Sequence, residues 1–94
     1  MRIEHLAYQV EDAVAVAAWY VEHLGFEVVR RVESVPHMHF LADSSGNTLI
    51  EIYSNPAVAV PDYRSMNPLL LHLALVTDDN DADTQRLLAA GATI

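Results

Sequence analysis

The triplet His5-Leu6-Ala7, near the start of the chain, returns as His72-Leu73-Ala74 when the sequence is shifted against itself by 67 positions. The same shift sets Asp12 over Asp79. Behind each aspartate an alanine-rich stretch runs toward a glycine, Gly25 in the first copy and Gly91 in the second. Self-similarity of this kind is typical of a repeated supersecondary unit. The sequence therefore predicts one and a half copies of a single unit.

The first copy predicts a strand, a helix and three further strands. β-Branched and aromatic residues indicate the first strand, and Asp12 is a good N-cap for the helix that follows. Gly25 can adopt the left-handed conformation that ends a helix. The polar turn 43–47 favours a hairpin between the last two strands. We expect strands at 3–10, 26–32, 37–42 and 48–53 and a helix at 13–23.

The second copy predicts a strand at 70–77 and a helix at 84–90, after an irregular, proline-containing linker at about 56–68. The expected fold class is α+β, with tandem βαβββ units in a half-open, curved, mixed sheet. Residues 1–94 would form one domain, divided into a unit at about 1–55 and a partial unit at 69–94. The partial unit would leave a sheet edge unpaired. We therefore expect a continuation of the chain or, in a symmetric homodimer, a second subunit to cover it.

Composition narrows the function classes. The chain has 94 residues, no cysteine and a formal net charge of −8. This charge repels nucleic acid and anionic membrane surfaces, so neither is an expected partner. Without cysteine, a metal site has to consist of histidine and carboxylate ligands. The N-terminus has no apolar signal segment, and the expected location is the cytoplasm.

Three residues are candidate metal ligands. His5 and His72 occupy the same position in the two copies. Glu51 stands in the apolar strand segment Leu49-Ile50-Glu51-Ile52-Tyr53, where an unpaired carboxylate costs several kcal/mol unless it is exposed, protonated or bound to a cation. His, His and carboxylate suit Zn, Ni, Fe or Mn, and the ligand set does not choose among them.

Four further residues are candidates for a substrate pocket. Side chains alternate along a strand, so Gln9 shares a face with His5, and Tyr53 shares one with Glu51. Arg30 could hold an anionic group of the substrate, although a solvated strand face explains it as well. His39, with His37, could reach the same cavity or lie at an exposed strand edge.

These residues resemble the glyoxalase, bleomycin-resistance and extradiol-dioxygenase superfamily, which has the vicinal oxygen chelate fold. The resemblance lies in Ile3-Glu4-His5-Leu6-Ala7, Trp19-Tyr20 before Leu24-Gly25-Phe26, Leu49-Ile50-Glu51-Ile52 and His72-Leu73-Ala74-Leu75. It implies that His5, Glu51 and His72 match three of the four metal ligands of glyoxalase I. The fourth, a glutamate that also takes part in proton transfer, would lie beyond Ile94.

The resemblance implies three functions that the sequence leaves open. The leading hypothesis is a divalent-metal-dependent lyase or isomerase of glyoxalase type, acting on a small substrate that chelates the metal through vicinal oxygens, with Glu51 as a candidate catalytic residue. The main alternative is a non-catalytic protein of the bleomycin-resistance type, which would sequester a cationic drug. An extradiol-type dioxygenase is the third. The substrate and any role of glutathione stay undefined.

Overall fold

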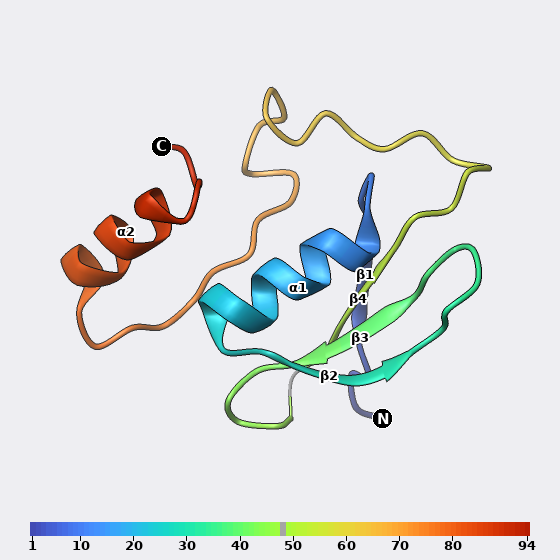
Figure 1. Cartoon of the computed structure of the whole chain (residues 1–94), viewed down its shortest axis with the longest axis horizontal. Coiled ribbons are helices and arrows are strands. Elements are labelled where there is room, and N and C mark those ends of the chain that lie inside the picture. Colours follow the sequence, from blue (N-terminus) through green and yellow to red (C-terminus); the bar gives the residue numbers. More distant parts are fainter. Residues whose placement is uncertain (48) are drawn as a thin grey trace. The chain divides into compact units, whose positions relative to one another are not determined.

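The structure is a computed structural model that describes residues 1–47 and 49–94 (Figure 1). It divides into two compact units, Met1–Asp62 and Tyr63–Ile94. The described elements follow in the order β1 (Leu6–Gln9), α1 (Ala13–Leu24), β2 (Glu27–Arg31), β3 (His39–Ala42), β4 (Leu49–Tyr53) and α2 (Asn80–Ala89). The first unit therefore contains the strand, helix and three strands that the sequence predicts, and β1, β2 and β3 are shorter than expected. Thr48, the expected first residue of the last strand, lies outside the described residues.

The first unit is built on a four-stranded mixed sheet with the strand order β1-β4-β3-β2. β3 pairs antiparallel with both β2 and β4, whereas β1 pairs parallel with β4. The parallel pair is possible because α1, β2 and β3 form the long connection that parallel neighbours need. The turn after β3 is closed by Gly46, whose backbone N–H donates to the carbonyl of Asp43 at 3.0 Å. The open mixed sheet confirms the α+β class.

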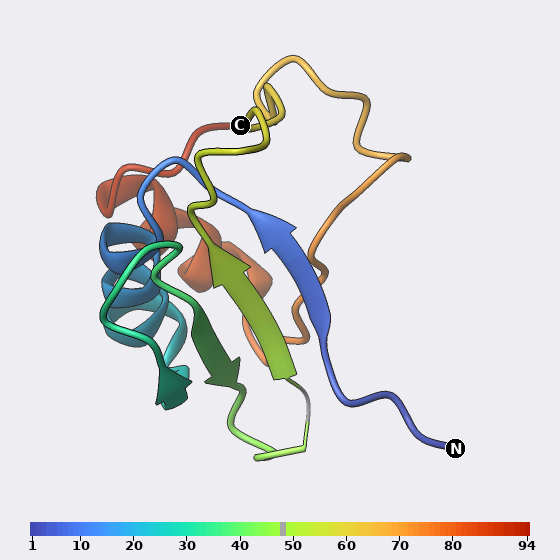
Figure 2. The same ribbon diagram turned by 90° about the vertical axis from the view of Figure 1, so that its right-hand side faces the viewer.

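α1 packs on one face of this sheet, as Figure 2 shows by the helix lying beside the strands. The Asp12 carboxylate accepts from the backbone N–H of Ala15 at 3.0 Å and so caps the helix as predicted. Gly25 ends it with φ of +70°. Between helix and sheet lies the core, which contains Val10, Ala13, Ala17, Phe26, Leu41, Ile50 and Ile52.

The second unit contains α2, which begins at Asn80 rather than at the predicted Thr84. Its N-cap is Asp79, whose carboxylate accepts from the backbone N–H of Ala82 at 2.9 Å. The repeat thus aligns the two N-caps, because Asp79 and Ala82 match Asp12 and Ala15 after the 67-residue shift. The local structure of the two helix starts is the same.

The predicted strand at 70–77 is wrong as a description of this structure, since residues 72–77 form no strand or helix. A strand is stable only when its N–H and C=O groups pair with a neighbouring strand. Several apolar side chains of this segment are exposed, among them Leu70 at 77% and Val76 at 102%. The sequence pattern identified a segment with strand propensity, but propensity does not provide the partner.

Candidate functional site

The two faces of the sheet carry different side chains. Residues that pair directly across neighbouring strands share a face. Ile52, Ile50 and Leu41 face α1, because they belong to the core. On the opposite face the register sets Ala7 beside Glu51, Glu51 beside Phe40, and Phe40 beside Arg30. We call this row of four residues the Glu51 face.

His5 and Glu51 meet on this face. His5 lies just before β1, and its Nε2 is 3.0 Å from Oε2 of Glu51. The Glu51 side chain is 12% exposed and that of His5 is 30% exposed. Nδ1 of His5 contacts the Glu4 carboxylate. Both ring nitrogens of His5 therefore lie beside carboxylate oxygens.

Phe40 is the aromatic centre of the Glu51 face. It is 8% exposed, yet it does not belong to the core cluster under α1. The His5 ring meets it edge-on, with 5.2 Å between the ring centroids. The Arg30 guanidinium carbon lies over it, 5.3 Å from the centroid. Phe40 therefore lies between an imidazole and a guanidinium, next to a carboxylate.

A β-bulge brings Arg30 to this face. The register of β2 against β3 shifts between Val28 and Arg30, so that Val28 pairs with Leu41 and Arg30 with Phe40. In a regular strand Arg30 would share the face of Val28, which packs against the core. The extra residue, Val29, reverses the alternation, as bulges do.

The other predicted pocket residues have different surroundings. Gln9 is 6% exposed, and its side chain bonds the backbone of the segment after β4. Its Nε2 donates to the carbonyls of Asn55 and Val58, and its Oε1 accepts from the Asn55 N–H at 3.0 Å. Tyr53, opposite Gln9 in the register, is half-buried at the end of β4.

His39 departs from the expectation of a pocket or edge residue. It pairs with Ile52 and so lies on the face of the sheet that carries the core. It is 6% exposed, and its Nδ1 donates to the backbone carbonyl of His37 at 2.6 Å. The cross-strand register, which depends on the β3–β4 hairpin, decides this placement.

The candidate ligand His72 lies in the second unit. Its Nδ1 donates to the carbonyl of Pro68 at 2.9 Å, which leaves Nε2 with its lone pair. This is the tautomer that a metal-binding histidine with a backbone partner adopts.

The donor atoms of the first unit fit part of a metal site. Adjacent ligands of an octahedral ion at about 2.1 Å are roughly 3.0 Å apart. The contact between His5 and Glu51 has this length. Among residues 1–47 and 49–94, however, no group of three or more histidine or carboxylate side chains is arranged so that it could hold a metal ion. A metal site that includes His72 stays a prediction.

Sequence reasoning missed Phe40, although the signal was present. Phe40 has the opposite parity to His39 and Leu41 and is the only aromatic residue of β3. Its face becomes evident once it is paired with Glu51 across the hairpin. Predicting that pairing from the sequence requires the length of the hairpin turn, because the turn sets the register of the two strands.

Comparison with known proteins agrees with this geometry. Residues 2–94 match the model of the glyoxalase/bleomycin resistance protein/dioxygenase superfamily. The chain belongs to this superfamily. No curated protein gave a significant match.

Two solved structures from Streptomyces sp. CB03234 are similar to this superfamily member. One is described as a glyoxalase/bleomycin resistance protein, with 25% identity, a TM-score of 0.58, and coverage of 94% of this chain and 75% of that one. The other is TnmS3, an antibiotic binding protein, with 27% identity, a TM-score of 0.58, and coverage of 97% and 74%. Within the described part of the chain, no helix has the length and apolar character needed to cross a membrane.

Proposed function

We propose that this chain binds a small organic ligand of the antibiotic type on the Glu51 face and does not convert it. The observation that carries the proposal is the position of Phe40, a buried aromatic ring on the face opposite α1, between His5 and Arg30. The similarity to an antibiotic binding protein supports it.

The chemistry of the Glu51 face suits binding. Ligand sites combine an apolar or aromatic surface with a few polar groups that fix orientation. Phe40 provides the aromatic ring against which His5 and Arg30 pack, Arg30 provides a cationic donor, and Glu51 provides an anionic acceptor. Aromatic contacts contribute about 0.5–1.5 kcal/mol beyond the area they bury.

The test uses the two phenylalanines of the chain as a matched pair. Phe40 and Phe26 are both 8% exposed, but Phe26 belongs to the core on the α1 side. Calorimetric titration of aromatic antibiotics, with bleomycin first, should show saturable binding that EDTA leaves unchanged, and mass spectrometry should recover the ligand unaltered. Phe40→Leu should weaken binding about tenfold, which equals about 1.4 kcal/mol. Phe26→Leu should lower stability and leave the affinity within about twofold of the parent. Equal effects of both variants, or conversion of the ligand, would refute the proposal.

A metal-dependent lyase or isomerase of glyoxalase type is the second candidate, and the contact between His5 and Glu51 favours it. A bound divalent ion would act as a Lewis acid on the vicinal oxygens of the substrate. His5 and Glu51 would hold the ion, with His72 as the third expected ligand. Titration with Zn, Ni, Mn and ferrous iron should then show one site that His5→Ala removes. Oxygen consumption with ferrous iron and a catechol tests the dioxygenase alternative.

A symmetric homodimer is part of the proposal. Several apolar residues are exposed, among them Leu69, which is 86% exposed, and Leu70, which is 77% exposed. Their burial in an interface would be favourable. Sedimentation should show a dimer, and a stable monomer at micromolar concentration would contradict this. The expected location in the cytoplasm stays a prediction.

A further inference from the structure

Arg30 differs from the other arginines whose contacts are described. The five basic residues of the chain are all arginines. Arg31 pairs with Glu33 at 2.7 Å, and Arg86 pairs with Asp83 at 2.8 Å. In the part of the chain that the structure describes, no carboxylate pairs with Arg30, whose guanidinium lies over Phe40 instead. Its N–H donors are therefore not engaged by an acidic side chain.

The surroundings of Arg30 leave room for a ligand. Its guanidinium carbon lies over the Phe40 ring, and the residue as a whole is exposed. A surface hollow of about 290 Å³, lined by Val28, Val29, Arg30 and Arg31, lies beside it. A flat guanidinium that stacks on one ring can stack on a second ring with its other face, while its edge donates two parallel hydrogen bonds to a carboxylate.

We propose that Arg30 determines specificity by binding the anionic group of a flat aromatic ligand. The inference rests on the proposed function, since it takes the Glu51 face as the binding surface. The net charge of −8 opposes anions at long range, but exposed charges more than about 8–10 Å away are largely screened at physiological salt. The charge of a guanidinium in direct contact with the ligand is not screened in this way. The charge of Arg30 therefore outweighs the net charge of the chain in binding an anionic group.

The experiment compares 2-naphthoate with 2-naphthamide, which share one ring system and differ in charge. Calorimetric titration of the whole chain should give an affinity for naphthoate at least tenfold higher than for naphthamide. In Arg30→Gln this preference should fall to less than twofold. Arg2→Gln is the matched control, because it makes the same change in net charge at an exposed residue that does not line the hollow. It should retain the preference.

Each outcome decides the inference. Equal affinity for the two probes in the parent chain would overturn the role of Arg30, and so would a loss of preference in Arg2→Gln as large as in Arg30→Gln. If both probes bind equally and Phe40→Leu weakens both, only the inference on Arg30 fails and the proposed function stands. If neither probe nor any antibiotic binds, both fail.

Discussion

The coupling between His5 and Glu51 gives the sharpest prediction for stability. Glu51 is mostly buried, and His5 Nε2 contacts its carboxylate at 3.0 Å. His5→Ala removes this partner and leaves a buried acceptor unsatisfied, which costs about 1–3 kcal/mol. It also removes the edge contact with Phe40, worth about 0.5–1.5 kcal/mol. In a Glu51→Leu background only the second cost remains. The expected coupling free energy is therefore about 1–3 kcal/mol.

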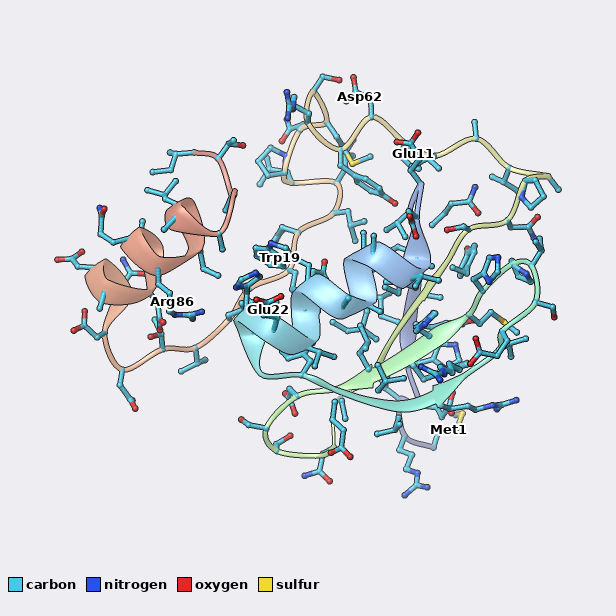
Figure 3. All side chains as sticks on the ribbon, in the orientation of Figure 1. Met1, Glu11, Trp19, Glu22, Asp62 and Arg86 are labelled. Carbon is cyan, nitrogen blue, oxygen red and sulfur yellow. The ribbon has the colours of Figure 1, made fainter. Side chains whose placement is uncertain are left out.

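A double-mutant cycle measures this coupling. Urea unfolding of the parent, His5→Ala, Glu51→Leu and the double variant is followed by the fluorescence of Trp19, the one tryptophan of the chain, which lies on α1 (Figure 3). EDTA keeps divalent ions away from both side chains. If the changes in unfolding free energy of the two single variants add up to that of the double variant within about 0.5 kcal/mol, the two residues are independent. That result would refute the reasoning on the Glu51 face.

Three further predictions concern local structure, two in the first unit and one in the second. Gln9→Leu should destabilise the first unit by about 1–3 kcal/mol, because the carboxamide holds both the N–H and the C=O of Asn55, and hydrogen exchange at the Asn55 amide should accelerate; unchanged exchange would contradict this. Asp12→Ala should cost about 1 kcal/mol in urea unfolding through loss of the N-cap, whereas an effect below about 0.3 kcal/mol would count against the cap. Two hydrogen bonds lower the pKa of Asp83 below its ordinary value of 3.8. The larger effect comes from Thr77, and the next comes from Arg86, which projects from α2 (Figure 3). Since the folded pKa is lowered, the stabilisation is present at neutral pH and is lost as pH falls through that lowered pKa. An NMR titration of Thr77→Val should show the Asp83 pKa closer to 3.8, and an unchanged value would exclude the hydrogen bond as its cause.

Local signals predicted the first unit well. Asp12 and Gly25 set the ends of α1 within one residue, because capping depends on side chains and backbone conformations that lie close in sequence. His5 and Glu51 were predicted to lie together from strand alternation and the family resemblance, and the parallel pairing of β1 with β4 brings them into contact. The aspartates of the repeat marked both helix starts.

Long-range register decided what the sequence did not reveal. The bulge at Val29 turns Arg30 to the Glu51 face, and no residue type in β2 predicts this bulge. His39 lies on the core face because of its pairing with Ile52, which the hairpin turn sets. Residues 70–77 have strand propensity, but a strand exists only where another strand pairs with it.

The binding of a ligand to the face of the sheet opposite α1 is the central claim, and intermolecular nuclear Overhauser effects test it most directly. In a complex with an aromatic ligand, the ligand ring protons should show effects to the Phe40 ring and to the side chain of Arg30, both on the Glu51 face. The methyl groups of Ile50 and Ile52, which lie in the core under α1, should show none. Effects to these methyl groups without any to Phe40 would contradict the account.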